Sequence, residues 1–354
     1  LMKTLETIIL EIDPFNIEEE KIKEAAKAIC ENKTVVFPTE TVYGLGANGL
    51  SEQAVKKIFI AKGRPFDNPL ILHIANIKSF LEYAYVSYSL LEKIEKLIPG
   101  PVTFVLKKKK IVPDIVTAGK DTVAIRMPAH PIASKLIEYS GVPIAAPSAN
   151  ISGKPSATLA EHVIQDMKDK VDYIIVGGKV EFGIESTVID LTTGEKPVLL
   201  RPGPIPPQKI AEIFGDIEIP DFAYGHVEAD YIKAPGMKYR HYAPEGNLTI
   251  YEGAMDNVIN EINKNAEEKC RKGHTVGVIA TDETKALYRF GIIKTIGSRK
   301  DEASIAAGLY QILREFDELK TEYIYSESFT DNPLGQAIMN RLLKAAGYQI
   351  VKLS

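Results

Sequence analysis

Short apolar runs alternate with stretches of helical spacing over the first 215 residues of the chain. The apolar and β-branched runs predict strands at 34–37, 70–74, 103–106, 122–127, 143–146, 173–176, 186–191 and 198–200. Helical spacing predicts helices at 17–30, 51–62, 89–98, 130–139 and 158–170, the second with Ser51 as a candidate N-cap and Gly63 as its end. Several strand runs are almost continuously apolar, which is typical of strands covered on both faces. Because some strands follow one another without a helix between them, we expect a mixed sheet.

The pattern breaks after residue 215. Residues 216–246 carry no sustained periodicity, yet they include four tyrosines. Structureless connections of this length are usually either disordered or functional, and this one is too aromatic for plain disorder. We therefore predict a functional linker.

Strands and helices alternate from residue 248 to the end of the sequence. We predict strands at 248–251, 275–280, 292–296, 323–325 and 349–353, with helices ending at 271 and spanning 301–318 and 335–346. The predicted fold is α/β: a twisted mixed sheet with helices on both faces over 1–215, then the linker, then a smaller Rossmann-like, doubly wound parallel-sheet domain over 247–354. This second domain lacks a Gly-x-Gly-x-x-Gly string, which argues against a dinucleotide site.

Composition excludes several classes of protein. The chain has 354 residues, 45% of them hydrophobic, and a formal charge of −4, so it lacks the basic excess of a dedicated nucleic-acid binder. No apolar run approaches the roughly 18 residues of a membrane-spanning helix, and acids occupy the place of a signal peptide's apolar stretch, so we expect a cytoplasmic protein. Cys30 and Cys270 cannot form a disulfide framework or a four-cysteine zinc site, and the six histidines show no paired zinc spacing.

Four polar, glycine-rich segments mark candidate chemistry where strands should end. The first, PTETVYGLG at 38–46, places three hydroxyls, the Glu40 carboxylate and two glycines after a predicted strand. This composition suits a ligand-facing turn. A strand-to-helix connection that needs glycine for backbone reasons explains it equally well.

The second segment, AKGRPFDNPLILHI at 61–74, carries Lys62 and Arg64 at the end of a predicted helix. Cations are favoured there by the helix dipole alone. Pro65 and Pro69 stiffen the loop after this helix, however, and two cations on a stiff loop can grip phosphates.

The third segment, APSANISGKPSAT at 146–158, is rich in hydroxyls and in amide groups around Gly153, and it precedes a helix. Such an N–H-rich concavity at a helix N-terminus suits a phosphate. It is not a P-loop, because the chain has no G-x-x-x-x-G-K-[ST] string. A serine- and glycine-rich loop without a ligand is the alternative.

The fourth segment is GIESTVIDLTT at 183–193, followed by LLRPG at 199–203. A lone Arg201 before Pro-Gly is more often a surface ion-pairing residue than a ligand contact. Arg126 follows the apolar residues 123–125 and needs a partner if it is buried.

In this order, PTETVYGLG, K-x-R-P-x-x-N-P-L, S-x-N-x-S-G-x-P-S, G-x-x-S-T-V-x-D and R-P-G resemble the threonylcarbamoyl-AMP synthase family. PGMKYRHYAP at 235–244 is similar to the linker signature of its long, archaeal and eukaryotic-type branch. The resemblance implies a nucleotidyltransferase that joins L-threonine, bicarbonate and ATP into threonylcarbamoyl-AMP and releases pyrophosphate. A separate transferase would use this product to modify the adenosine next to the anticodon of tRNAs that decode ANN codons.

The resemblance also implies roles for individual residues. Lys62 and Arg64 would be the catalytic cations, and the ATP site would comprise Lys62, Arg64, Asn68, Thr122, Ser148, Asn150, Ser156, Arg201 and, from the linker, Tyr239. The L-threonine site would comprise Thr41, His73, Arg126, Ser186 and the backbone of Ala146. A magnesium ion would accompany ATP without any organic prosthetic group, and spacing assigns no carboxylate to it.

Physical chemistry agrees with this set of residues. Threonylcarbamate attacks an anionic phosphate, so the barrier is dominated by bringing anions together, and cations and N–H donors lower it. The threonine amine must be neutral to capture carbon dioxide or bicarbonate, which favours a desolvating site. Because the carbamate and the mixed anhydride both hydrolyse readily, we expect the linker, with Tyr239 and Tyr242, to act as a lid that excludes water.

Two other functions remain possible on the sequence. A carbamoyl-transfer enzyme of hydrogenase maturation shares a domain like the first half, but the Cys-rich zinc modules of such enzymes cannot be built from two cysteines. A module that binds double-stranded RNA or tRNA is the second, with the lysine run 107–110 as its contact. The net charge makes direct tRNA binding weak or absent, and that run is predicted to be a solvated hairpin tip.

Overall fold

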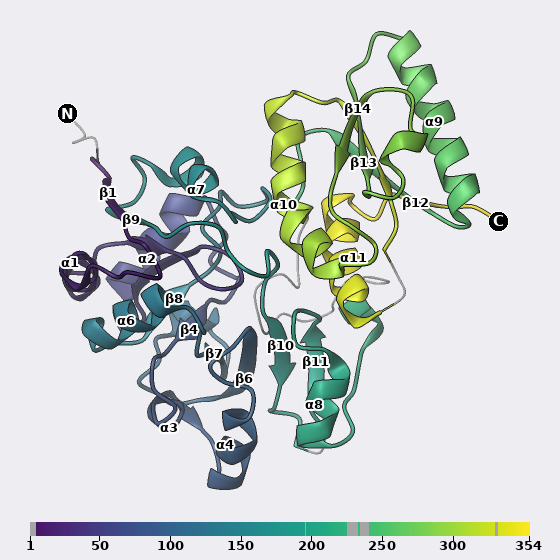
Figure 1. The fold of residues 1–354 in the computed structure, drawn as a ribbon. Coiled ribbons are helices and arrows are strands. Elements are labelled where there is room, and N and C mark those ends of the chain that lie inside the picture. The colour runs from purple at the N-terminus through teal and green to yellow at the C-terminus, as the bar shows by residue number, and fades with distance from the viewer. Residues whose placement is uncertain (1–4, 195, 225–232, 234–240, 330–331) are drawn as a thin grey trace. The chain divides into compact units, whose positions relative to one another are not determined.

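The structure is a computed structural model that describes residues 5–194, 196–224, 233, 241–329 and 332–354, and it divides into two compact units (Figure 1). The first unit comprises Leu1–Ser152 and Ser156–Lys238, and the second comprises Gly153–Pro155 and Tyr239–Ser354.

The first unit is built on an 11-stranded sheet. Its strands are β1 (Ile8–Glu11), β2 (Val35–Phe37), β3 (Gly44–Asn48), β4 (Ile71–His73), β5 (Ala84–Tyr85), β6 (Val102–Lys108), β7 (Thr122–Arg126), β8 (Ile144–Ala146), β9 (Tyr173–Val176), β10 (Thr187–Asp190) and β11 (Val198–Arg201). The mixed character of the sheet is as predicted, but β1, β3 and β5 were not among the eight predicted strands. The order is β1-β9-β2-β3-β8-β4-β7-β6-β10-β11, and β5 pairs with β6. Parallel pairs such as β4 with β7 adjoin antiparallel pairs such as β6 with β7.

Strand β3 begins inside the first polar segment and continues past its end to Asn48, and the sequence did not predict it. The run has two glycines and no β-branched residue, so its strand propensity is low. A Cβ atom on Gly46 would lie 2.5 Å from Cγ2 of Ile144 and 2.7 Å from Cε1 of Phe37. The glycine is therefore needed for close packing beside β2 and β8, which supports the backbone explanation for this half of the segment.

Helices cover both faces of this sheet. The helices are α1 (Glu19–Cys30), α2 (Glu52–Lys62), α3 (Ser79–Tyr83), α4 (Tyr88–Glu95), α5 (Asp114–Thr117), α6 (Pro131–Ser140), α7 (Ala160–Met167), α8 (Pro207–Phe214) and the 3-10 helix η1 (Asp221–Tyr224). Val35 shares a core with Ile22 of α1 and Leu136 of α6, whereas its neighbour Val36 shares another core with Ile58 of α2. Since neighbouring residues of a strand face opposite sides, the two cores lie on opposite faces.

Helix α2 begins and ends where its sequence predicts. The Ser51 side chain accepts a hydrogen bond from the Ala54 amide, and Gly63 adopts a left-handed φ of 61°. This end presents Lys62 and Arg64.

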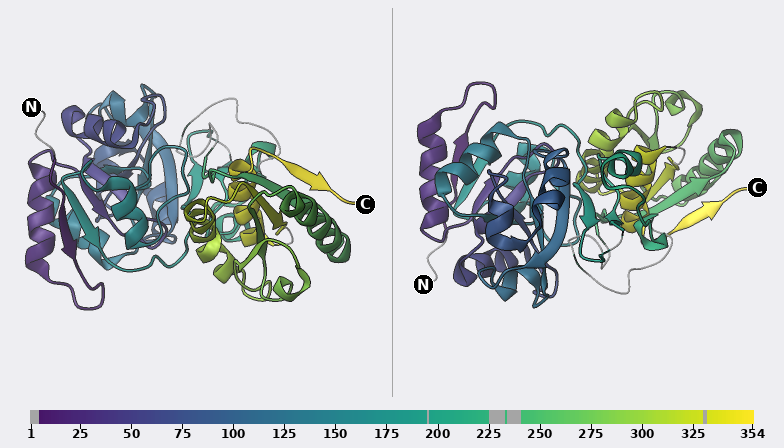
Figure 2. Two further views of the ribbon diagram at one scale, coloured as in Figure 1. Left: turned by 90° about the horizontal axis from the view of Figure 1, so that it is seen from above. Right: turned by 90° about the horizontal axis from the view of Figure 1, so that it is seen from below.

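The second unit is a five-stranded parallel sheet in the order β14-β13-β15-β12-β16, which confirms the prediction. Its strands are β12 (Asn247–Glu252), β13 (Val276–Ala280), β14 (Ile292–Thr295), β15 (Tyr323–Glu327) and β16 (Ile350–Lys352), and its helices are α9 (Met255–Arg271), α10 (Glu302–Glu318), α11 (Pro333–Ala345) and the 3-10 helix η2 (Lys285–Leu287). Val278 packs with Ile262 of α9, whereas a Cβ on Gly277 would meet Phe316 of α10 at 2.4 Å. The sheet of this unit therefore lies between α9 and α10 (Figure 2).

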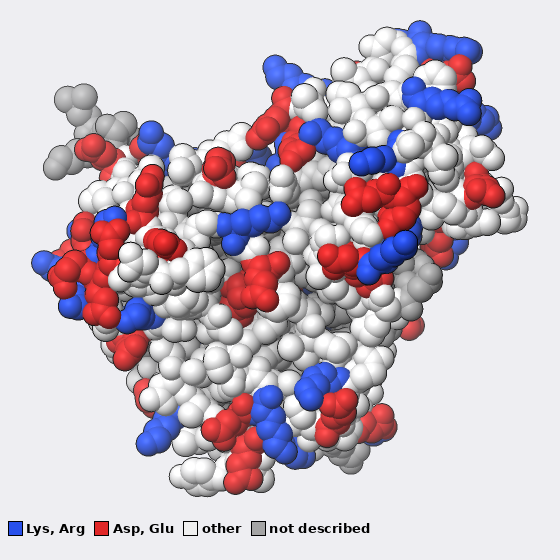
Figure 3. Space-filling view, viewed as in Figure 1, with Lys and Arg blue, Asp and Glu red and all other residues white. Residues whose placement is uncertain are grey.

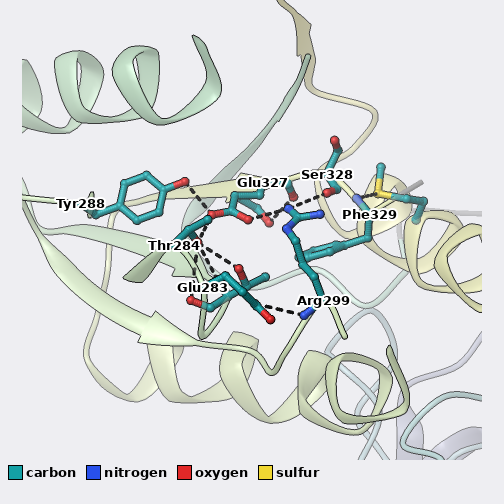
Figure 4. Close-up of polar contacts among 10 residues, drawn as sticks. Glu283, Thr284, Tyr288, Arg299, Glu327, Ser328 and Phe329 are labelled. Atoms are coloured by element: carbon teal, nitrogen blue, oxygen red, sulfur yellow. Dashed lines mark hydrogen bonds and ion pairs between the residues drawn. The ribbon is translucent and has the colours of Figure 1, made fainter. Parts of the chain in front are cut away.

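A buried carboxylate ties together the loops at the carboxyl edge of this second sheet (Figure 4). Glu327, the last residue of β15, is fully buried, and its Oε1 accepts hydrogen bonds from Thr284 and, at 2.7 Å, from Tyr288. Its Oε2 lies 2.6 Å from Nη2 of Arg299, whose guanidinium stands 5.1 Å from the Phe329 ring centroid. Both carboxylate oxygens are thus occupied, so this cluster braces the loops after β13 and β14.

No helix in the described part of the chain has the length and apolar character that crossing a membrane requires. On the face drawn in Figure 3, acidic and basic side chains are interspersed.

We predict that Glu327→Gln destabilises the second unit, because Arg299 loses its anionic partner. Because Arg299 is 31% exposed, the loss should resemble that of a charged hydrogen bond, about 1–3 kcal/mol of unfolding free energy. Hydrogen exchange of the β15 amides in the full chain measures this change. Glu268→Gln, which breaks the exposed pair with Lys272, is the matched control and should leave the exchange unchanged. Equal protection in both variants would contradict the bracing role.

Candidate active site

Backbone hydrogen bonds join three of the four polar segments in the first unit. The amide of Ala149 in the third segment donates to the carbonyl of Tyr43 in the first at 2.7 Å. The amide of Gly183 in the fourth segment donates to the carbonyl of Thr41 in the first at 3.1 Å. Segments that are far apart in the sequence thus form one site.

Lys62 joins the second segment to the third. Its side chain is 2% exposed, and its ammonium group donates to the carbonyl of Ser148 at 2.5 Å and to that of Asn150. The hydroxyl of Ser148 donates in turn to Oδ1 of Asn150 at 2.5 Å. The three predicted phosphate contacts therefore form one connected group, in which Lys62 also holds the loop in shape.

Arg64 and Asn68 form a second group at the start of β4. Nη2 of Arg64 donates to the carbonyl of Pro69 at 3.1 Å and to that of Asn68 at 3.4 Å, and both side chains are buried. Strand β4 runs parallel to β7, with Ile71 opposite Ala124. This group therefore lies toward the amino end of β7.

Strand β7 carries two predicted ligand contacts on one face. Alternation places Thr122, Ala124 and Arg126 on the same side, and Ala124 packs in an apolar cluster with Ile71 and Val105. Thr122 and Arg126 stand roughly 13 Å apart, at about 3.3 Å per residue. This face has a polar group at each end and an apolar middle, which suits a ligand with two polar parts.

Arg126 lies at the centre of the predicted L-threonine contacts. Its Nη1 donates to Oγ1 of Thr41 at 2.9 Å, and its Nη2 lies 2.7 Å from Oε1 of Glu40. His73 is its register partner on β4, and Ala146 lies on β8, the next strand beyond β4. The structure thus brings Thr41, His73 and Arg126 together, with Ala146 two strands from Arg126.

Ser186 and Arg201 lie toward the same end of the sheet. Arg201 donates from Nε to the Ser186 carbonyl at 3.0 Å and from Nη2 to its hydroxyl at 3.2 Å. The Ser186 hydroxyl is 2.8 Å from that of Thr103. Phe104, the next residue on β6, pairs with the residue before Arg126. Arg201 is 3% exposed, so it is not the surface ion-pairing residue that its sequence context favours.

Two further residues predicted to contact ATP, Ser156 and Thr122, have other surroundings in the first unit. The Ser156 hydroxyl donates to Oε1 of Glu185 at 2.6 Å, and both side chains are buried. Thr122 borders a cavity of about 850 Å³ that is also lined by Lys107, Lys120 and Lys233. The prediction for Tyr239 lies outside the described residues.

Three titratable groups around Arg126 have shifted pKa values. Burial, and then the charge of Arg126, lower the pKa of His73 to about 3, and burial lowers that of His130 to about 4. Burial alone would raise the pKa of Glu40, but the Arg126 guanidinium outweighs it and holds that pKa below its usual value. At neutral pH, this end therefore contains neutral histidines beside one anion and one cation.

Two buried polar atoms here have no hydrogen-bond partner in the described part of the chain. They are Nε of Arg126 and Nδ1 of His130. Nη2 of Arg126 is paired with the Glu40 carboxylate, which the backbone of Ala129 and of Glu40 also hydrogen-bonds. The two unpartnered atoms keep hydrogen-bonding capacity in a dry environment, which costs free energy unless a ligand uses it.

Comparisons with known proteins show which chains this one is similar to. Residues 27–203 match the Sua5_yciO_yrdC family model, described as telomere recombination, and residues 205–347 match the model of the threonylcarbamoyl-AMP synthase C-terminal domain. The chain is 49% identical to threonylcarbamoyl-AMP synthase of Pyrococcus abyssi, covering 98% of this chain and 100% of that protein. The chain belongs to the threonylcarbamoyl-AMP synthase family. It is also 44% identical to the Bacillus subtilis synthase, over 99% and 100% of the two chains.

A solved structure extends this likeness to three dimensions. The crystal structure of P. abyssi Sua5 complexed with L-threonine matches with a TM-score of 0.92 and 48% identity, covering 98% of this chain and 100% of that one. The family resemblance seen in the motifs is therefore confirmed over both units. A hydrogenase-maturation enzyme with extra modules does not fit full-length coverage of this kind.

The sequence analysis gave no role to three residues that contact the predicted site residues. Glu40 was noted within its segment but given no contact, and Glu185 and Thr103 were not considered. Alternation along the predicted strand 103–106 could have placed Thr103 on the ligand face. Nothing in the local sequence indicates that Glu185 meets Ser156, because a fold-level contact joins them.

We predict that His73 makes stability fall as the pH falls. Its pKa is about 3 in the folded chain and about 6.5 in the unfolded chain, so the unfolded state binds more protons between these values. Between pH 7 and pH 5 this should cost about 2 kcal/mol of unfolding free energy. Urea unfolding at both pH values measures it. His73→Asn should remove that part of the loss, and an identical loss in the variant would contradict the assignment.

Proposed function

We propose that this chain is a nucleotidyltransferase that synthesises threonylcarbamoyl-AMP from L-threonine, bicarbonate and ATP with release of pyrophosphate. The observation that carries the proposal is the buried Arg126, whose Nε has no hydrogen-bond partner in the described part of the chain and whose Nη2 is paired with Oε1 of Glu40 at 2.7 Å. An Nε/Nη2 edge can bind a carboxylate through two parallel hydrogen bonds. The P. abyssi relative, which has been crystallised with L-threonine, supports an amino-acid carboxylate there.

The two substrates would lie along the β7 face, and Arg201, which is assigned to ATP, lies with Ser186 toward the Arg126 end. Arg126, Thr41, His73, Ser186 and the backbone of Ala146 would bind L-threonine at one end. Lys62, Arg64, Asn68, Thr122, Ser148, Asn150, Ser156, Arg201 and Tyr239 would bind ATP, with its polyphosphate along the Lys62 and Arg64 groups.

The reaction needs electrostatic stabilisation more than a general base. The carbamate oxygen forms a bond to the α-phosphorus of ATP, the bond from that phosphorus to the bridging oxygen breaks, and pyrophosphate leaves. Charge accumulates on phosphate oxygens during this step, and preorganised cations and N–H groups lower its barrier. Lys62 and Arg64 are held rigidly by backbone carbonyls, so they would need little reorganisation when ATP binds.

Magnesium would accompany ATP without a protein cage. In the described part of the chain, no group of three or more histidine, cysteine or acidic side chains could hold a metal ion. Magnesium commonly keeps its waters and binds through substrate phosphates. We therefore assign it no protein ligand.

The linker would act as a lid on this site. Lys233 forms an ion pair with the fully buried Asp190 at 2.5 Å and donates to Oγ1 of Thr192 at 3.2 Å. It also lines the cavity that Thr122 borders. The contacts of Lys233 support a lid that would exclude water from a carbamate and a mixed anhydride, which both hydrolyse.

The product would pass to a separate transferase that modifies tRNA, and this chain's own tRNA binding would be weak or absent. The net charge of −4 and the interspersed charges of Figure 3 support this interpretation.

The reaction is tested with ATP, labelled bicarbonate and L-threonine, with detection of labelled adenylate and pyrophosphate. We expect Arg126→Lys, which keeps the charge beside Glu40 but loses the fork, to lower kcat/KM for threonine about a hundredfold. Arg64→Ala should abolish product. Arg271→Ala removes an exposed arginine in the second unit and should keep the wild-type rate. Wild-type rates in both site variants would refute the assignment.

The lid is tested by Lys233→Met, which keeps the side chain's length and removes its charge. We expect more threonylcarbamoyl-AMP to be hydrolysed per turnover, with an increase of roughly tenfold from the loss of a charged hydrogen bond. Deletion of residues 216–354 should have the same effect or a larger one. Unchanged product lifetime in both proteins would remove the lid from the mechanism.

A further inference from the structure

Three residues of the third polar segment belong to the second unit. The segment spans 146–158, and its residues Gly153–Pro155, here called the tip, group with Tyr239–Ser354. Ser152 and Ser156, on either side of the tip, belong to the first unit. The second unit therefore contains the middle of a segment that is proposed to bind phosphate.

Two hydrogen bonds hold the tip within the second unit. Nη2 of Arg314, on α10, donates to the carbonyl of Pro155 at 2.6 Å. The Ala243 amide donates to the carbonyl of Gly153 at 2.9 Å. Arg314 is 5% exposed and Pro155 is also buried, so the bond from the guanidinium is a charged hydrogen bond shielded from water, which is a strong kind.

Charged groups of the second unit surround Arg314. Asp317, three residues further along α10 and hence on the same side of the helix, accepts a hydrogen bond from the Glu245 amide at 2.7 Å. Burial raises the pKa of Asp317 to about 6, whereas the charges of Lys154 and Arg314 act to lower it. Asp317 is therefore mostly ionised at neutral pH, and its charge helps to keep the Arg314 guanidinium beside the tip.

The first unit holds the segment on both sides of the tip. The Ser152 amide donates to the carbonyl of Lys62 at 3.0 Å, and the Tyr43 amide donates to the carbonyl of Ala157 at 2.9 Å. The two ends of the segment are thus fixed by the first unit, and the orientation of the tip is fixed by the second.

The carbonyl that Arg314 binds lies in the same planar peptide group as the Ser156 amide. Holding this carbonyl therefore also fixes the direction of the Ser156 N–H group. That amide donates no hydrogen bond to any residue that the structure describes, and the Ser156 hydroxyl already donates to Glu185. A fixed N–H group with no acceptor is a donor that a phosphate oxygen can use.

We infer that Arg314 is a positioning residue for ATP: by binding the Pro155 carbonyl, it directs the Ser156 amide toward the phosphates. The second unit thus takes part in nucleotide binding through the backbone of the third segment, without a contact between Arg314 and the nucleotide. This inference rests on the proposed function.

Calorimetry on the full chain tests the inference with two ligands, each added alone. One is α,β-methylene-ATP with magnesium, which cannot lose pyrophosphate, and the other is L-threonine. We expect Arg314→Met, which removes the donor and keeps an unbranched side chain, to raise the Kd of the ATP analogue roughly tenfold, as the loss of a charged hydrogen bond would. The Kd of L-threonine should not change, because no residue proposed for its site lies in the tip.

Two further variants isolate the hydrogen bond. Arg314→Lys keeps a donor for the carbonyl but loses the planar fork, so its Kd for the ATP analogue should rise by only about threefold. Arg271→Met makes the same change at an exposed arginine of the second unit and should leave both Kd values unchanged. If Arg314→Met does not fold, Arg314→Lys decides the matter, and a wild-type Kd for the ATP analogue would overturn the inference.

The outcomes separate this inference from the proposed function. An unchanged Kd of the ATP analogue in folded Arg314→Met would overturn the inference. Equal weakening of both ligands would also overturn it, because a general loss of structure acts on both. Either result leaves the proposed function intact as long as the wild type forms labelled adenylate, and failure of the wild type to form it would refute the proposed function itself.

Discussion

The buried Glu40–Arg126 ion pair is the constraint on which the site depends. Two charges with side-chain exposures of 3% and 5% have lost nearly all their hydration, and their mutual attraction offsets this only with further hydrogen bonds. Thr41 accepts one of these from Nη1 of Arg126, and the backbone of Ala129 and of Glu40 hydrogen-bonds the carboxylate. Nε of Arg126 has no partner in the described residues, so the folded chain keeps a polar, water-poor spot with a donor that a ligand could use. A site of this kind binds by filling existing vacancies in hydrogen bonding and needs little rearrangement.

The sheet explains why this spot lies beside an apolar surface. A mixed sheet lets β4 and β7 run parallel while β6 and β8 run against them. The ligand face of β7 therefore passes from Arg126 through an apolar middle to Thr122, and neighbouring strands add Ile71 and Val105 to that middle. An apolar centre between two polar ends suits ligands that combine charged groups with a flat apolar part. ATP has such a flat part in its adenine ring.

Much of this could be predicted from the sequence, for identifiable reasons. Continuous apolar runs predicted eight strands of the first sheet, because strands covered on both faces leave a strong signal. Strand β3 was missed because Gly46 is selected by close packing against Phe37 and Ile144, which a propensity scale cannot express. Glu40 was visible in its motif, but its pairing with Arg126 depends on a contact between residues far apart in the sequence, which no local pattern encodes.

The contacts of Lys62 show why motifs that are distant in sequence act as one. A lysine at a helix end is favoured by the helix dipole, so local reasoning gives it a sufficient structural cause. In the fold, however, its ammonium group is buried on the carbonyls of Ser148 and Asn150, and it fixes the loop that carries the hydroxyls proposed for phosphate binding. The structural and chemical explanations are therefore not alternatives. A cation that anchors the loop is already placed where phosphate charge would arrive, so the contact that stabilises the fold also preorganises the site.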